Sequence, residues 1–130
     1  MYKFCPEVAA GLGIPRSPAE ISYGDGTRVL EQQSTVVNRD GFDVTSLFIH
    51  GAEKTLELVK KEHIKLAVLK DGSPSCGSST IYDGSFSSLK IRGRGFTTAL
   101  LEQHGIHVFN ENDIQSADRY LSMLLSSKRD

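Results

Sequence analysis

The sequence predicts an α/β fold in which helices pack on a mainly parallel β-sheet. Short apolar runs typical of buried strands alternate with segments whose apolar residues recur at helical spacing. The chain has 130 residues, the usual size of one domain, and no boundary is visible, so we expect a single domain over residues 1–130. Hydrophobic residues make up 38% and charged residues 24% of the chain, a composition that favours a packed core over disorder.

The N-terminal part is expected to hold short strands joined by turns. Residues 1–5 are typical of a short strand that stops at Pro6. Residues 8–18 contain two glycines and two prolines and are expected to be irregular. Residues 19–30 are typical of two short strands around Gly24-Asp25-Gly26, so we expect a β-hairpin there.

A long helix and a buried strand are predicted for the middle of the chain. Apolar residues recur at helical spacing over about residues 44–62, and the carboxylate of Asp43 can cap the first amides of that helix. Residues 64–70 are short and mostly apolar, which indicates a buried strand. The small-residue stretch over 73–80 is then a loop, and residues 80–92 hold a turn.

The C-terminal part repeats the alternation of helix and strand. We expect a helix over about residues 96–104 that ends at Gly105, and a buried strand over 106–109. Asn112 or Asp113 caps a final helix. One face of that helix carries Ile114, Ala117, Leu121, Leu124 and Leu125.

Composition excludes several classes of function. The chain has 15 basic and 16 acidic side chains, so it lacks the excess of positive charge that a general nucleic-acid binder needs. No stretch approaches about 18 consecutive apolar residues, so we expect no membrane span. No signal peptide is visible, which predicts a cytoplasmic protein whose thiols stay reduced.

Both cysteines of the chain follow predicted strands. Cys5 ends the strand over residues 1–5, and Cys76 lies in the loop after residues 64–70. Ligands of open α/β sheets bind beyond the carboxyl ends of the strands, so parallel neighbours would bring both thiols to one edge. Two thiolates do not complete a zinc or iron–sulfur site, and a reactive thiol, a metal ligand and plain burial all remain open.

The loop over residues 73–80 is a candidate for binding an anion or a small ligand. Gly77 allows a sharp turn that exposes backbone amides, and Ser78 and Ser79 continue the loop, so these amides can cradle an anion. The alternative is an ordinary turn with a buried cysteine.

Two weaker signals lie elsewhere. Glu7 follows Cys5 by two residues and can act as a general acid or base if it is partly desolvated, or it is a surface glutamate. Gly93-Arg94-Gly95 precedes a helix and could bind phosphate or carboxylate, although a tight turn is the favoured interpretation.

A set of motifs then resembles a known family. They are Cys5-Pro6-Glu7-Val8, Pro15-Arg16-Ser17-Pro18-Ala19-Glu20, Gly41-Phe42-Asp43-Val44-Thr45, Ser73-Pro74-Ser75-Cys76-Gly77 and Ile81-Tyr82-Asp83-Gly84. Their order and sequence resemble the bacterial 2-thiouracil desulfurase-like family, formerly described as a domain of unknown function. The resemblance covers residues 4–111.

The resemblance implies a three-layer, Rossmann-like α/β fold and a cytoplasmic enzyme. Enzymes of the family hold a [4Fe-4S] cluster through three cysteines, and the open iron takes sulfur from a thiolated pyrimidine, which gives uracil and sulfide. Cys5 and Cys76 correspond to two of these metal ligands, Glu7 to a catalytic glutamate, and Ser73 or Ser75 to a serine near the site.

The family's remaining cysteine has no counterpart in this sequence. It lies in an N-terminal strand–loop–helix unit, whereas this chain starts at about the second strand, so we expect a fold that is N-terminally truncated relative to the family. A cluster held by three cysteines of one chain is then not expected.

Three interpretations remain. The chain is a degenerate, non-catalytic module that binds a small ligand or an anion or only self-associates, a desulfurase completed by another chain, or a fragment. A homodimer that covers the open sheet edge fits the first two, and we predict one.

Overall fold

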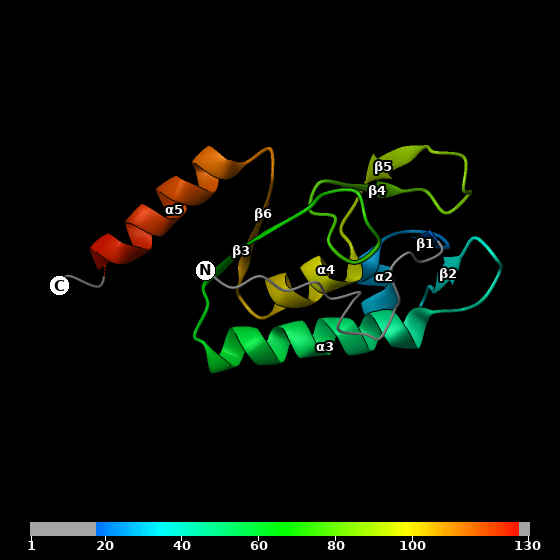
Figure 1. The fold of residues 1–130 in the computed structure, drawn as a ribbon, viewed down its shortest axis with the longest axis horizontal. Coiled ribbons are helices and arrows are strands. Elements are labelled where there is room, and N and C mark those ends of the chain that lie inside the picture. Colours follow the sequence, from blue (N-terminus) through cyan, green and yellow to red (C-terminus); the bar gives the residue numbers. More distant parts are fainter. Residues whose placement is uncertain (1–17, 128–130) are drawn as a thin grey trace.

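The structure, a computed structural model, describes residues 18–127 as short strands and longer helices (Figure 1). The strand predicted for residues 1–5 lies outside the described residues, as do Cys5 and Glu7. The described elements are, in chain order, β1 (Ala19–Ile21), α2 (Gly26–Leu30), β2 (Val36–Asn38), α3 (Thr45–Lys61), β3 (Leu66–Leu69), β4 (Thr80–Tyr82), β5 (Lys90–Arg92), α4 (Phe96–Gln103), β6 (His107–Asn110) and α5 (Ile114–Ser127).

A parallel pair of strands, β3 and β6, forms the centre of the described fold. Leu66 pairs with His107 and Leu69 with Asn110, so the two strands end at the same edge. Two antiparallel pairs, β1–β2 and β4–β5, accompany it within residues 18–127. The predicted α/β class is confirmed, and the strands predicted over 64–70 and 106–109 are present with slightly different bounds.

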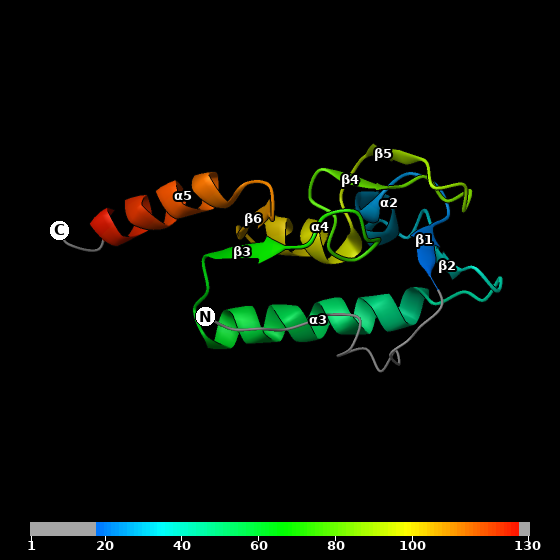
Figure 2. The same cartoon turned by 45° about the horizontal axis from the view of Figure 1, so that its top comes forward.

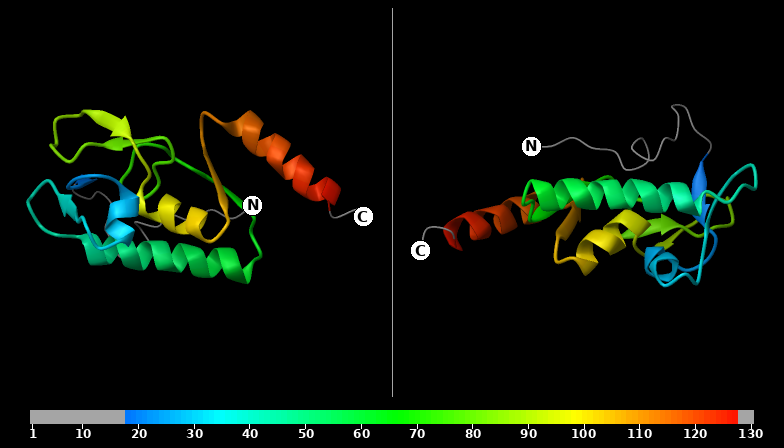
Figure 3. Two further views of the ribbon diagram at one scale, coloured as in Figure 1. Left: turned by 180° about the vertical axis from the view of Figure 1, so that it is seen from behind. Right: turned by 90° about the horizontal axis from the view of Figure 1, so that it is seen from below.

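The helices lie on both sides of the parallel pair. Figures 1 and 2 show α3 and α4 on one side of β3 and β6, and α5 on the other. Figure 3 shows that α5 also extends away from α3 and α4. This is the layered order of helix, sheet and helix that the alternation of elements predicts.

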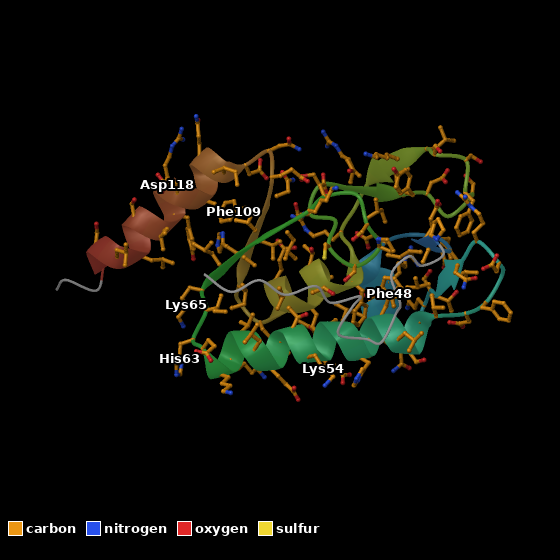
Figure 4. The ribbon with its side chains drawn as sticks, in the orientation of Figure 1. Phe48, Lys54, His63, Lys65, Phe109 and Asp118 are labelled. Atoms are coloured by element: carbon orange, nitrogen blue, oxygen red, sulfur yellow. The ribbon has the colours of Figure 1, made fainter. Side chains whose placement is uncertain are left out.

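Helix α3 confirms the helix predicted over residues 44–62. Its buried residues include Phe48, Ala52, Thr55 and Val59, which recur every three to four positions. Figure 4 shows Phe48 on the side that faces the rest of the chain and Lys54 on the opposite side. The carboxylate of Asp43 accepts a hydrogen bond from the Thr45 amide at 2.9 Å. Asp43 therefore satisfies an amide at the start of the helix, as expected, although the residue that flanks the helix is Val44.

The β-hairpin predicted for residues 19–30 is wrong. Strand β1 pairs instead with β2, so that Ile21 lies opposite Val36. The second half of the segment forms helix α2, because Asp25 accepts a hydrogen bond from the Thr27 amide at 3.0 Å and so caps a helix rather than occupying a turn. The Gly-Asp-Gly pattern is compatible with a hairpin turn and with a capped helix start, so the local sequence alone does not decide between these two structures.

The main buried core of the described residues joins residues of β1, α2, β2, α3, β4 and α4, and α5 contributes nothing to it. It includes Ile21, Val36, Phe48, Ile81 and Phe96. Strands β3 and β6 are only partly buried, since Val68 is 44% exposed. On the apolar face of α5, Ala117 is buried but Ile114, Leu121 and Leu125 are exposed. None of the described helices is long and apolar enough to cross a membrane.

Candidate functional site

A cleft of about 900 Å³ lies at the carboxyl end of β3. Its walls come from four places: Glu20 and Asn38 on the β1–β2 pair, the start of α3 with Phe48, the loop that follows β3, and the β4–β5 hairpin with Tyr82 and Lys90. A concave site at the carboxyl ends of parallel strands is where α/β proteins bind small ligands. The prediction that the loop after β3 lies at such an edge is therefore confirmed by the fold.

The backbone amides predicted to cradle an anion do so, but the anion belongs to the chain itself. One carboxylate oxygen of Asp71 accepts hydrogen bonds from the amides of Ser78 at 2.9 Å, Ser79 at 3.1 Å and Thr80 at 3.1 Å. The other oxygen accepts a hydrogen bond from Thr80 Oγ1 at 3.2 Å. Partial burial pushes the pKa of Asp71 up, but the amide hydrogen bonds outweigh it and hold the pKa below its usual range.

The loop is therefore built by three residues that do not line the cleft within the described part of the chain: Gly77, Ser78 and Ser79. A Cβ on Gly77 would lie 2.4 Å from the carbonyl oxygen of Thr80, so the loop closes only with glycine there. Ser78 is buried, and its hydroxyl accepts a hydrogen bond from Asn110 Nδ2 at 3.0 Å. The amides of Ser78 and Ser79 donate to Asp71 and the amide of Gly77 donates to the Ser73 carbonyl, so ligand binding by these three residues stays a prediction.

Ser73 and Cys76 line the cleft, whereas Ser75 lies behind them. Ser73 Oγ accepts a hydrogen bond from the Cys76 amide at 2.7 Å, which holds the two residues together. Ser75 is 1% exposed, and its hydroxyl lies 2.7 Å from Thr97 Oγ1 and accepts a hydrogen bond from Cys76 Sγ at 3.8 Å. Of the two serines predicted for the site, Ser73 can reach a ligand and Ser75 can act only through the thiol.

The loop also seals the start of α4. The carbonyl oxygen of Pro74 accepts a hydrogen bond from the Phe96 amide at 2.7 Å, and that of Ser75 accepts from the Thr97 amide at 2.9 Å. A Cβ on Gly95 would lie 2.5 Å from the Ser75 carbonyl group. Because the first amides of α4 donate to the loop, they are not free to bind a phosphate. The tight turn expected at Gly93-Arg94-Gly95 is not present, since these residues form an irregular link that is extended at Gly95.

The Arg94 side chain also binds groups of the protein itself. Its guanidinium donates a hydrogen bond to the carbonyl oxygen of Ser78 and lies 2.7 Å from the carboxylate of Glu102. Burial raises the pKa of Glu102, although the positive charges of Arg94 and His107 oppose that change. Arg94 thus connects the Cys76 loop to the outer side of α4.

Charge on the cleft walls is mainly positive. Arg39, Lys70 and Lys90 supply three cations, and Glu20 and Asp71 supply two carboxylates. Both carboxylates accept hydrogen bonds from backbone amides, in the case of Glu20 from Gly84 at 2.9 Å and Phe86 at 3.2 Å. The amides are uncharged and leave both carboxylates negative, so the described lining has a small positive excess of three cations over two carboxylates.

Three residues of this site were missed by sequence reasoning: Glu20, Asp71 and Asn110. Each lies on a strand or just after one, which is the usual place for site residues. The partners of Glu20 and Asn110 are more than 30 residues away along the chain, whereas Asp71 binds residues seven to nine positions further on. Asn110 follows three apolar or aromatic positions of β6 and is 2% exposed, so its polarity at the strand end was the available signal. The meeting of Cys5 with Cys76 concerns a residue outside the described part of the chain and stays a prediction.

The comparisons with known proteins agree with this geometry. The profile of the 2-thiouracil desulfurase family matches residues 1–113. The YbbK protein of Bacillus subtilis (strain 168), described as uncharacterized, is 47% identical over 110 residues, which are 85% of this chain and 73% of YbbK. A solved structure of TudS, a [4Fe-4S]-dependent thiouracil desulfidase, superposes with a TM-score of 0.84 at 46% identity and covers 94% of this chain and 74% of its own. The chain belongs to the 2-thiouracil desulfurase family.

Proposed function

We propose that this chain removes sulfur from a thiolated pyrimidine, such as 2-thiouracil, in the cleft beside Cys76. The observation that carries the proposal is the place of Cys76, the cysteine of the family motif, on the wall of a cleft of about 900 Å³. That volume lies within the range of roughly 300–1,000 Å³ that small-molecule sites occupy. The TudS structure, which shares 46% of its aligned residues with this chain, supports the choice of substrate class.

A [4Fe-4S] cluster with Cys5 and Cys76 among its ligands is part of this proposal. When bound, such a cluster supplies soft iron, which accepts the sulfur of a thiocarbonyl group. Within residues 18–127, no group of three or more histidine, cysteine, aspartate and glutamate side chains is placed to hold a metal ion. Cys76 supplies one thiolate, so the other ligands have to come from residues outside that range or from a second chain. A reducing, cytoplasmic compartment is part of the same proposal.

The chain's own residues have separate tasks in the proposed reaction. Replacing a C=S group by a C=O group consumes one water molecule and releases one molecule of hydrogen sulfide, so protons have to move. Glu7 is the group that we propose moves them. Ser73 Oγ accepts from the Cys76 amide at 2.7 Å, which leaves the hydroxyl hydrogen to orient a ligand. Ser75 contacts the thiol from behind and supports it.

The positive walls of the cleft suit this chemistry. Sulfur that leaves a thiocarbonyl group carries negative charge as a thiolate or as hydrosulfide. Arg39, Lys70 and Lys90 line the cleft and stabilise such charge, and they outnumber the two carboxylates of the described lining.

A homodimer belongs to the same proposal. Two chains carry four cysteines, which is enough for a cluster if the two sites meet at the dimer axis. The exposed apolar side chains of α5, such as Leu121 and Leu125, give a dimer apolar surface to cover.

Anaerobic reconstitution of the full chain with iron and sulfide tests the proposal. We expect a brown protein with thiolate-to-iron absorption and the release of sulfide from 2-thiouracil. Cys76→Ser abolishes both the absorption and the sulfide release. Ser87→Ala, on the exposed tip of the β4–β5 hairpin, is the matched control and leaves both unchanged.

Two outcomes contradict the proposal. Colour that persists in the Cys76→Ser variant shows that Cys76 is not a ligand of the cluster. A wild-type chain that stays colourless and releases no sulfide contradicts the desulfurase function, and it favours a non-catalytic module that binds an anion or a small ligand in the same cleft.

A further inference from the structure

Asp71 closes the loop that carries Cys76. It lies two residues after the end of β3, and its carboxylate accepts hydrogen bonds from the amides of three consecutive residues, Ser78, Ser79 and Thr80, at 2.9 to 3.1 Å. A fourth hydrogen bond comes from Thr80 Oγ1 at 3.2 Å. Hydrogen bonds to an ionised acceptor are roughly twice as strong as those between neutral groups. Both ends of the loop are therefore joined through one side chain.

The neighbouring strand strengthens this closure. Asn110 ends β6 and donates hydrogen bonds from Nδ2 to the hydroxyls of Ser78 at 3.0 Å and Ser79 at 3.2 Å. Glu111 accepts a hydrogen bond from the Asp71 amide at 3.0 Å. Because β3 and β6 are paired in parallel, Asp71 and Asn110 come from the same edge of the sheet, and both bind Ser78 and Ser79.

The closed loop determines where the thiol lies. Cys76 sits between Asp71 and the residues that Asp71 binds, and inside the loop the Gly77 amide donates to the Ser73 carbonyl at 3.0 Å. Asp71 is partly exposed and lines the cleft. It therefore remains part of the cleft wall although its carboxylate binds the loop amides. Loss of the carboxylate would leave three amides without an acceptor and let the loop open.

We propose that Asp71 is a positioning residue that holds the Cys76 thiol in place at the wall of the cleft. The inference rests on the proposed function in one respect, which is that Cys76 is the group to be positioned. Asp71 itself touches neither the substrate nor the cluster in this proposal. It acts through the backbone of residues 78–80.

The rate of Cys76 alkylation by iodoacetamide at neutral pH tests the proposal without a cluster. The full chain carries Cys5→Ser in every variant, so that Cys76 is the remaining thiol. We expect Asp71→Ala to raise the rate about tenfold or more, since opening the loop exposes a half-buried thiol. We expect Asp71→Asn to raise it only two- to threefold, roughly, because the amide oxygen still accepts the three backbone hydrogen bonds without charge, although the NH2 group cannot accept the fourth from Thr80 Oγ1.

Asp83→Ala is the matched control. Asp83 accepts hydrogen bonds from the amide and the hydroxyl of Ser85 at 2.9 and 2.6 Å, within the hairpin and away from the Cys76 loop. In the Asp83→Ala variant, the rate of Cys76 alkylation should equal that of the Cys5→Ser parent. Thr80→Val removes one of the four hydrogen bonds to Asp71 and should give a small increase, and it serves as a second variant if Asp71→Ala does not fold.

The outcomes separate this inference from the proposed function. Equal alkylation rates in Asp71→Ala and the parent, or a rise in Asp83→Ala of the same size as in Asp71→Ala, overturn the positioning role. If Asp71→Ala does not fold, equal rates in Thr80→Val, Asp71→Asn and the parent overturn it. A wild-type chain that never gains colour on reconstitution contradicts the cluster proposal, and the alkylation series still decides the role of Asp71.

Discussion

Ser75 and Thr97 join the Cys76 loop to helix α4 through two hydroxyl groups that lie 2.7 Å apart. Ser75 is 1% exposed and Thr97 is fully buried, so water cannot replace either partner. The same two residues are also joined through the backbone, where the Thr97 amide donates to the Ser75 carbonyl at 2.9 Å. The loop that carries the thiol is thus attached to a rigid element, and the contact is open to a direct test.

Thr97→Val should destabilise the protein by about 1–3 kcal/mol, because the variant keeps the shape of the side chain but leaves the buried Ser75 hydroxyl without this partner. The free energy of unfolding in urea measures the effect. Thr27→Val, at an exposed position of α2, is the control and should change the free energy by about 0.5 kcal/mol or less. Equal effects of the two variants would show that the buried pair adds no stability.

The Asp71 cradle should make the loop sensitive to acid. Backbone hydrogen bonds hold the pKa of Asp71 below the ordinary value of 3.8 in spite of partial burial. A carboxylate with a lowered folded-state pKa contributes stability that is complete above its unfolded-state pKa and is lost as the pH falls through the folded-state value. We therefore expect the amide proton shifts of Ser78, Ser79 and Thr80 in NMR spectra to change together, with a midpoint below 3.8.

Asp71→Asn is the test variant for this acid response. The variant should remove the common titration of the three amide protons. It should also make the free energy of unfolding fall less steeply below about pH 4. The contributions of Asp43 and Asp83 remain, because their pKa values are also lowered. A midpoint above 3.8 in the wild-type chain would contradict the assignment of the cradle as a site that favours the charged carboxylate.

Local patterns predicted the elements, and long-range partners decided the details of the site. The helix expected over residues 44–62 is present as Thr45–Lys61 because its apolar spacing and its cap lie within the segment itself. The hairpin expected over residues 19–30 is absent because β1 finds its partner in β2. The amide cradle was predicted from glycine and serine in the loop, but its occupant, Asp71, could be identified only once the loop was seen to fold back on the end of β3.

Gly95→Ala should displace the Cys76 loop from α4. Gly95 has an ordinary φ of −68°, so the backbone tolerates alanine, but the new Cβ would lie 2.5 Å from the Ser75 carbonyl group. Overpacking of this kind costs about 1–3 kcal/mol. We expect a lower free energy of unfolding together with weaker binding of the reconstituted cluster, measured by iron content after gel filtration.

Gly105→Ala is the matched control for that variant. Gly105 has a φ of +80° and no atom within 4 Å of the position of a new Cβ, so alanine there costs only the strain of a left-handed backbone, about 1–2 kcal/mol. Iron content should stay at the wild-type value although the stability falls. If both variants lose iron equally, the loss follows from general destabilisation, and the contact between Gly95 and Ser75 has no special part in the site.

A dimer of the full chain is the last prediction. The apolar side chains Leu121 and Leu125 on α5 are 44% and 52% exposed, and burying them against a second copy would stabilise the association. Light scattering after gel filtration should give a mass near twice 14.3 kDa. Leu121→Glu should shift the protein toward the monomer, whereas Glu57→Gln, on the exposed side of α3, should not. A wild-type chain that stays monomeric at high concentration contradicts the dimer, and a site shared between two copies is then excluded.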